Sequence, residues 1–139
     1  MLDRMERGAI NHLCLTVRSL ARSEPFYAAV LGYLGYRLIG RWPDKLEWDG
    51  PGGSLLLRQA KPGSPAHDRF HVGLHHLAWN AESRADVDRF HRELLHPLGA
   101  AVLDPPGEFP QYSAGYYAVF FADPDGIKLE FAYSPNAAH

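Results

Sequence analysis

The chain has 139 residues, 46 % of them hydrophobic, which is enough for one globular domain with a substantial core. Its formal net charge of -2 argues against a nucleic-acid-binding or anionic-membrane-binding surface. The opening stretch MLDRMERGAI lacks the apolar segment of a secretory signal, and no apolar run approaches the roughly 20 residues that span a bilayer. The single cysteine, Cys14, excludes an intrachain disulfide. We therefore expect a cytoplasmic protein without membrane segments.

The first half of the chain predicts a strand, a helix and further strands. Residues 10–17 are rich in apolar and β-branched types, which indicates a strand. A helix follows, which Ser19 or Ser23 can cap and Gly32 or Gly35 can end. After the helix come strand signals at 36–40 and 54–59, with a connection or short strand at 42–48.

The second half predicts the same order of elements. Residues 61–70 combine proline, glycine and charge, which indicates a linker. The elements expected after it are a strand at 72–80, a helix at 83–96, a short strand at 100–103, a proline-rich loop at 104–113 and strands at 115–122 and 127–133. We therefore predict an α+β domain over 1–139 made of two tandem βαβββ modules, at about 10–60 and about 71–134.

An internal repeat supports these modules. A shift of 64 positions places His12 on His76, and the same shift places Leu31 on Leu95 and Gly35 on Gly99. Equivalent residues of a repeat occupy equivalent places in two copies of one unit. If the copies pack about a pseudo-two-fold axis, the two histidines can approach one another.

The last strands of the two modules differ in a way that matters for chemistry. Aligning their turn glycines, Gly53 with Gly126, matches Leu57 with Glu130. The second module thus has a carboxylate where this alignment gives the first module a leucine.

His12, His76 and Glu130 together form a predicted metal site. Two imidazoles and one carboxylate on one side of a divalent ion leave coordination positions open, as in non-haem iron and catalytic zinc sites. A substrate oxygen or water can be polarised at such a position. His75 is expected to point to the opposite face of the strand and to have a minor role; it aligns with Asn11.

The paired modules, the histidine-led opening strands, the helix with FY and VLGYLGY, and the closing DPDGIKLEF resemble the vicinal oxygen chelate superfamily. That superfamily includes glyoxalase I, bleomycin-resistance proteins, fosfomycin-resistance enzymes and extradiol dioxygenases. The resemblance implies that the modules form a cupped mixed sheet around a metal ion (iron, manganese, nickel or zinc) held by His12, His76 and Glu130. It also implies a homodimer.

Two departures from that pattern affect the choice of activity. In glyoxalase I, a further glutamate ligand lies on the last strand of the first module. The corresponding residue of this chain is Leu57 or, two residues further along the same face, Gln59. An extradiol dioxygenase would have a tyrosine ten residues before the glutamate, where this chain has Phe120. The nearest phenols belong to Tyr116 and Tyr117, which are candidate catalytic residues. Because side chains alternate along a strand, only one of the two is expected to point into the cup.

Aromatic and polar side chains are predicted to line the substrate site. The candidates for substrate binding are Trp79, Tyr112, Phe120, Gln59 and Arg58, with Phe109 as a further aromatic neighbour. The loop at 104–113 is interpreted equally well as a partial lid or as a surface crossover.

Two functions are consistent with these features. The first is a metal-dependent enzyme, a lyase, isomerase or dioxygenase, that binds a small molecule through adjacent oxygens. The alternative is a metal-free protein that binds a small molecule or drug, as bleomycin-resistance proteins do. A nucleic-acid partner is not supported by charge or motif.

Overall fold

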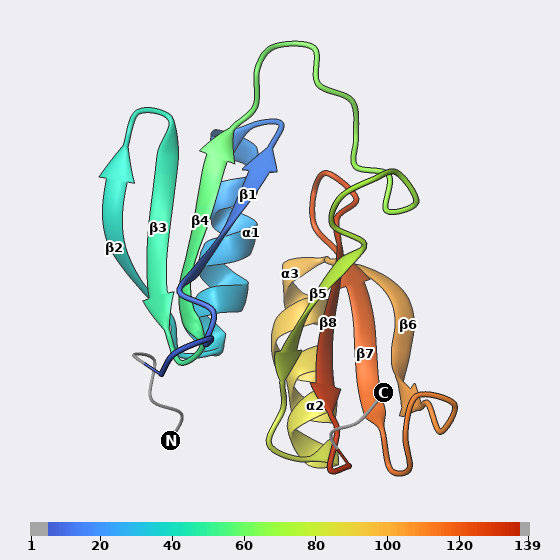
Figure 1. The fold of residues 1–139 in the computed structure, drawn as a ribbon. Helices are drawn as coiled ribbons and strands as arrows, with labels where there is room; N and C mark the ends of the chain where they lie inside the picture. Colours follow the sequence, from blue (N-terminus) through green and yellow to red (C-terminus); the bar gives the residue numbers. More distant parts are fainter. Residues whose placement is uncertain (1–5, 137–139) are drawn as a thin grey trace. The chain divides into compact units, whose positions relative to one another are not determined.

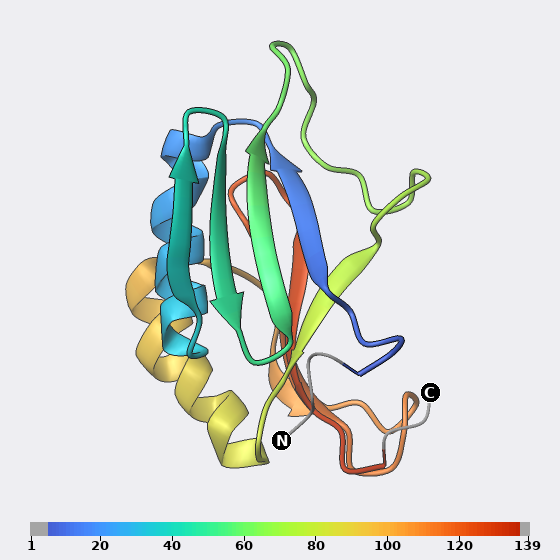
Figure 2. The same ribbon diagram turned by 60° about the vertical axis from the view of Figure 1, so that its left-hand side comes forward.

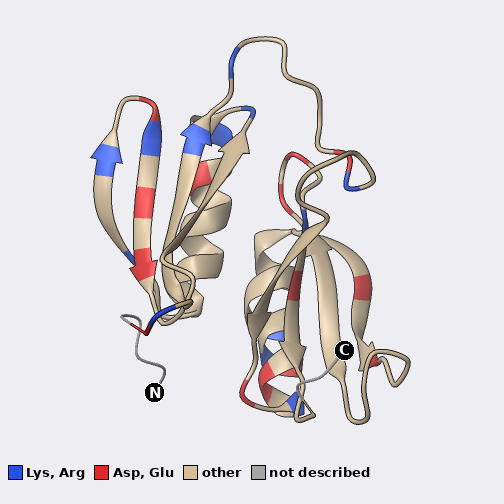
Figure 3. Ribbon diagram, in the orientation of Figure 1, with Lys and Arg blue, Asp and Glu red and all other residues tan. Residues whose placement is uncertain are grey.

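The computed structural model describes residues 6–136 and divides into a first unit that ends at Ala66 and a second that begins at His67. Each unit combines one four-stranded mixed sheet with helix (Figure 1). Acidic and basic residues are intermixed over both units (Figure 3). None of the helices in the described residues has the length and apolar character needed to cross a membrane.

The first unit is a βαβββ module. Its elements are β1 (His12–Val17), α1 (Leu20–Tyr33), β2 (Arg37–Trp42), β3 (Lys45–Gly50) and β4 (Gly53–Gln59). The strand order is β1-β4-β3-β2, with β1 parallel to β4 and the other pairs antiparallel (Figure 2). Helix α1 begins after Ser19, whose hydroxyl accepts the Arg22 N–H, and packs its apolar side chains against one face of the sheet.

The second unit repeats this topology. Its elements are β5 (His76–Asn80), α2 (Arg84–Phe90), a π-helical turn η1 (His91–Leu95), α3 (His96–Leu98), β6 (Ala101–Glu108), β7 (Tyr117–Ala122) and β8 (Lys128–Tyr133). The strand order is β5-β8-β7-β6, again with the first pair parallel. The predicted α+β fold with two βαβββ modules is therefore confirmed.

One predicted loop is partly a strand. Residues 104–113 are expected as loop because of their prolines, yet β6 extends to Glu108. The strand lies at the edge of its sheet and its pairing with β7 shifts register twice, between Val102 and Asp104 and between Asp104 and Gly107. An edge strand with bulges tolerates prolines because their missing N–H groups are not needed by a neighbour.

In each unit, buried apolar side chains fill the space between the sheet and its helix, and the second unit has a further buried cluster on the other face of its sheet: Tyr116, Ala118, Phe120 and Ala132. In the second unit the Phe90 ring of α2 lies 4.6 Å from that of Phe131 on β8 and 5.5 Å from that of Phe121 on β7. All three rings are buried. This aromatic contact fixes which side chains of β7 and β8 face the helix and which face away from it.

The turn into β4 depends on a glycine. Gly53 has φ +114°, and a Cβ there would lie 2.7 Å from the Asn11 carbonyl oxygen and 2.8 Å from that of Ile10. Gly63 also has a positive φ, +82°, but a Cβ there would meet nothing within 4 Å.

We expect Gly53→Ala to lower the free energy of unfolding by at least about 1 kcal/mol more than Gly63→Ala does, because only Gly53 adds a backbone clash to the cost of positive φ. Urea unfolding of both variants measures the difference. Equal losses would show that backbone conformation alone, and not the close approach to the Ile10 and Asn11 carbonyls, requires glycine here.

Candidate functional site

The two faces of the second sheet have different roles. Side chains alternate along a strand, so Leu129 and Phe131 of β8 share one face and Glu130 lies on the other. Phe131 packs against Phe90 of α2, and Glu130 is therefore on the face away from the helix. Its neighbours across the sheet are Ala78 of β5 and Phe120 of β7.

Glu130 is the centre of the candidate site. Its side chain is 2 % exposed, which is unusual for a carboxylate. One oxygen, Oε2, accepts a hydrogen bond from the Tyr116 hydroxyl, and the other, Oε1, lies 3.4 Å from Nε2 of His76. The structure thus brings together three residues that the sequence singled out.

The surroundings hold the phenol and the imidazole in their neutral forms. Burial, followed by the hydrogen bond to Glu130, raises the pKa of Tyr116 far above its usual value, so the hydroxyl stays a donor. Burial lowers the pKa of His76, and the positive charges of Lys128 and Arg69 lower it further. A neutral imidazole is the form that binds a metal.

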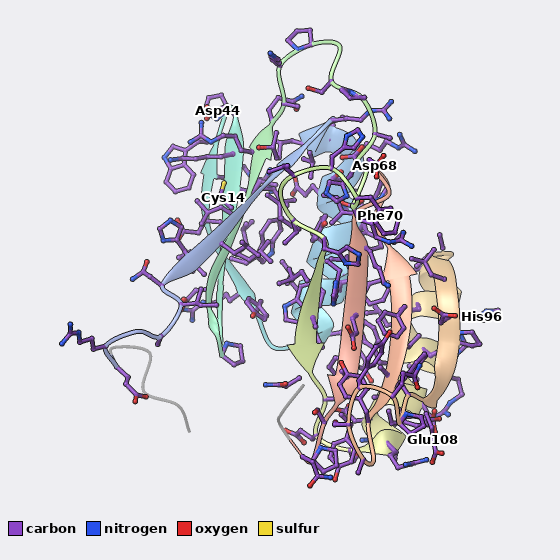
Figure 4. All side chains as sticks on the ribbon, turned by 45° about the vertical axis from the view of Figure 1, so that its right-hand side comes forward. Cys14, Asp44, Asp68, Phe70, His96 and Glu108 are labelled. Carbon is purple, nitrogen blue, oxygen red and sulfur yellow. The ribbon has the colours of Figure 1, made fainter. Side chains whose placement is uncertain are left out.

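His75 does not behave as strand alternation predicts. Strand β5 begins at His76, so His75 precedes the regular pleat. Its Nδ1 lies 2.7 Å from Nδ1 of His76, and its ring packs edge-on to Phe70, with centroids 5.5 Å apart. Figure 4 labels Phe70 in the segment that leads into β5.

Two of the predicted site residues lie on the helix face. Tyr117 follows Tyr116 in the chain, and its hydroxyl donates to Asp88 of α2 at 2.6 Å. Trp79 pairs with Phe131, so it shares that strand's helix-facing side. Of the two tyrosines, Tyr116 contacts Glu130 and Tyr117 contacts the helix.

Aromatic rings extend the face that carries Glu130. Phe109 packs edge-on to Phe120, with centroids 5.0 Å apart, and stacks on Tyr112 at 5.7 Å. Tyr112 in turn lies 5.3 Å from Tyr116. The Lys128 amine lies 4.6 Å above the Phe120 ring, so a positive charge borders the aromatic rings.

In the first unit the corresponding face carries His12. Side chains Leu15 and Val17 of β1 are buried, whereas His12 and Cys14 are exposed on the opposite face. Nδ1 of His12 lies 2.8 Å from Oδ1 of Asn11. Figure 4 labels Cys14 on this strand.

The pairing register corrects the position that corresponds to Glu130. Ala78 pairs with Glu130 in the second sheet, and Cys14, the repeat equivalent of Ala78, pairs with Leu56 in the first. The equivalent residue is therefore Leu56, not Leu57, which is fully buried. Aligning the glycines is off by one because the partner of His12 is Ser54, one residue after Gly53, whereas the partner of His76 is Lys128, two residues after Gly126.

Gln59 and Arg58 have partners within the first unit. The Gln59 amide accepts the Leu20 N–H at 3.0 Å and donates to the Arg18 carbonyl at 2.7 Å, which ties the end of β4 to the start of α1. Arg58 lies 3.3 Å from Asp44. Gln59 thus supports the fold around α1, and Arg58 forms a surface ion pair.

Within either unit, the residues from 6 to 136 contain no group of three or more His, Cys, Asp or Glu arranged to hold a metal ion. The second unit supplies a pair, His76 and Glu130. Two ligand atoms about 2.1 Å from one ion, at angles of 90–110°, are about 3.0–3.4 Å apart. The 3.4 Å separation of Nε2 and Oε1 fits two ligands of one ion.

The sequence of the chain matches a known protein family. The Glyoxalase/Bleomycin resistance protein/Dioxygenase superfamily matches residues 9–131. The chain belongs to this superfamily. The resemblance inferred from the repeated histidine strands and DPDGIKLEF is thereby confirmed.

Several relatives of this superfamily member have been described. The uncharacterized protein YqjT of Bacillus subtilis (strain 168) is 37% identical over 123 residues, which cover 87% of this chain and 95% of YqjT. The crystal structure of a candidate glyoxalase from Bacillus halodurans is similar with a TM-score of 0.80 and 27% identity, over 95% of this chain and 100% of that one. A glyoxylase/bleomycin resistance protein/dioxygenase domain from Frankia sp. EAN1pec has a TM-score of 0.76 and 30% identity, over 93% and 99% of the two chains.

Two residues near His76 and Glu130, namely Lys128 and Arg69, were not predicted from the sequence. Lys128 lies on the face of Glu130, and its place two residues before Glu130 on the same strand was a usable signal. Arg69, which acts on the pKa of His76, lies in the predicted linker, and nothing in its local pattern indicated a contribution.

Proposed function

We propose that this protein is a metal-dependent enzyme of the vicinal oxygen chelate type. His12, His76 and Glu130 would hold a divalent iron, manganese, nickel or zinc ion, and a small substrate would bind through adjacent oxygens. The observation that supports the proposal most is the buried Glu130 carboxylate, with one oxygen near Nε2 of His76 and the other held by Tyr116. A bound divalent ion would supply Lewis acidity at a substrate oxygen.

Other residues near Glu130 would orient its carboxylate and contact the substrate. Tyr116 holds Oε2 of Glu130 and leaves Oε1 directed toward His76. Phe109 and Tyr112 offer apolar surface for the carbon skeleton of the substrate, and Phe109 packs on the buried Phe120 ring. Lys128 brings a positive charge that favours a substrate with negatively charged oxygens.

A metal-free binding protein is the second candidate function. The stacked rings of Phe109 and Tyr112, near a buried carboxylate, would suit a planar cationic drug. Elemental analysis of protein purified anaerobically without chelator separates the two functions. Metal-free protein that cannot be reconstituted, yet binds such a drug tightly, would support the second.

The cytoplasmic location and the homodimer remain predictions. Light scattering of the purified protein measures its mass in solution and therefore tests the homodimer. A mass close to twice that of one chain is the expected result.

We expect Tyr116→Phe to weaken metal binding by about 10–100-fold, because it removes the hydroxyl that orients the Glu130 carboxylate. Tyr117→Phe is the matched control: it also removes a hydroxyl, but one that contacts Asp88 on the helix face. Competition with a chelator measures both affinities. A Tyr117→Phe effect as large as that of Tyr116→Phe would mean that the loss comes from general destabilisation.

A further inference from the structure

The histidine at the head of each repeat makes the same contact with the residue before it. In the first unit, Nδ1 of His12 lies 2.8 Å from Oδ1 of Asn11. In the second, Nδ1 of His76 lies 2.7 Å from Nδ1 of His75. Asn11 and His75 occupy equivalent positions of the repeat, so two different side chains serve one position.

These two contacts have the same chemical consequence. A neutral imidazole carries a proton on one ring nitrogen and a lone pair on the other. The amide oxygen of Asn11 only accepts, so its partner Nδ1 of His12 carries the proton and Nε2 keeps the lone pair. In the second unit, an Nδ1 lone pair on His75 lets His76 donate from Nδ1 in the same way. Nε2 of His76 then faces Oε1 of Glu130 at 3.4 Å.

We propose that Asn11 and His75 are positioning residues, which hold Nδ1 of His12 and His76 so that each histidine presents Nε2 as a ligand atom. The proposal rests on the proposed metal-binding function of the two histidines. Outer hydrogen bonds of this kind fix the tautomer and the ring orientation of a metal-binding histidine.

The covalent structure allows both asparagine and histidine to make this contact. Oδ1 of asparagine and Nδ1 of histidine are separated from their Cα atoms by the same number of bonds. Either atom can therefore reach the ring of the following residue from the same backbone position. The edge-on contact with Phe70 further restrains the His75 ring.

The repeat supplies its own control substitutions. Asn11→Ala and His75→Ala remove the contact, whereas Asn11→His and His75→Asn each introduce the residue that the other repeat uses. We expect each alanine variant to bind zinc about 10–100-fold more weakly than the wild type, and each exchange variant to stay within about 3-fold of it. Chelator competition measures the affinities, and thermal unfolding shows whether the variants remain folded.

Exchange variants that lose as much affinity as the alanine variants would overturn the proposal, since a contact shared by the repeats should survive the exchange. Alanine variants that are folded and bind zinc as tightly as the wild type would overturn it as well. Either result would leave the metal-binding function itself intact.

A second measurement does not depend on metal. Long-range proton–nitrogen correlation spectra of the metal-free protein at pH about 8, above the ordinary histidine pKa, report which ring nitrogen is protonated. We expect His12 to carry its proton on Nδ1 in the wild type and to lose this preference in Asn11→Ala. Protonation on Nε2 in the wild type would overturn the proposal for Asn11. A wild type that binds no zinc but keeps the Nδ1 proton would instead contradict the proposed function.

Discussion

Replacing Glu130 with alanine is expected to abolish metal binding while leaving the chain folded. The carboxylate supplies one of the three proposed ligands, and its Oε1 lies 3.4 Å from Nε2 of His76. The loss should exceed the 10–100-fold typical of outer hydrogen-bond partners, because a ligand atom itself is removed. Elemental analysis of wild type and variant, purified anaerobically without chelator, should give about one ion per wild-type chain and almost none in the variant.

Two further substitutions sharpen this experiment. Glu130→Gln keeps the size of the side chain and an oxygen that can accept from Tyr116, so its metal loss reports the charge rather than a cavity. Glu93→Gln is the matched control, since Glu93 lies on the π-helical turn with an exposed side chain beside Arg92. Wild-type metal content in Glu130→Ala would refute the proposed ligand set, and reduced metal content in Glu93→Gln would point to a nonspecific effect of lost charge.

The identity of the bound metal would narrow the reaction class. Iron that is lost on substitution of Glu130 would favour oxygen chemistry, and zinc or nickel would favour Lewis-acid chemistry at a substrate oxygen. Metal-free protein that resists reconstitution would favour the drug-binding alternative, in which the buried carboxylate pairs with a cation.

The fold was predictable because its signals are local and occur twice. Apolar strand patterns, a serine cap before the first helix and the repeat of His12 at His76 all predict the same module. Edge strand β6 was predicted only in part, because its bulges accommodate prolines that a local pattern assigns to a loop.

The structure brings three of the candidate residues together, His76, Tyr116 and Glu130, but the register of the first unit was predicted wrongly. A one-residue change in turn length moves every side chain to the other face of a strand, and this is how Leu57 was matched to Glu130 in place of Leu56. The same alternation places Trp79 and Tyr117 on the helix face. The contacts of Asn11 and His75 with the following histidines depend on side-chain conformations, which no spacing pattern indicates.

Replacing Phe90 with alanine is expected to have the largest effect on stability. The ring is fully buried against Phe121 and Phe131, and its removal should lower the free energy of unfolding by about 3–5 kcal/mol. Phe70→Ala is the matched control: Phe70 is 76% exposed, so its stability should change by less than about 0.5 kcal/mol. Urea unfolding measures both, and similar losses would contradict the assignment of the core to the helix face.

The Phe90 and Glu130 variants should separate the fold from the site, because alternate residues of β8 serve opposite faces of the sheet. Phe131 contacts Phe90 on the helix face, whereas Glu130 contacts Tyr116 on the other. Phe90→Ala should therefore be less stable but hold about one metal ion per folded chain, and Glu130→Ala should lose the ion and still unfold cooperatively. Loss of metal from folded Phe90→Ala would show instead that packing against α2 is needed to hold the ligand strand in place.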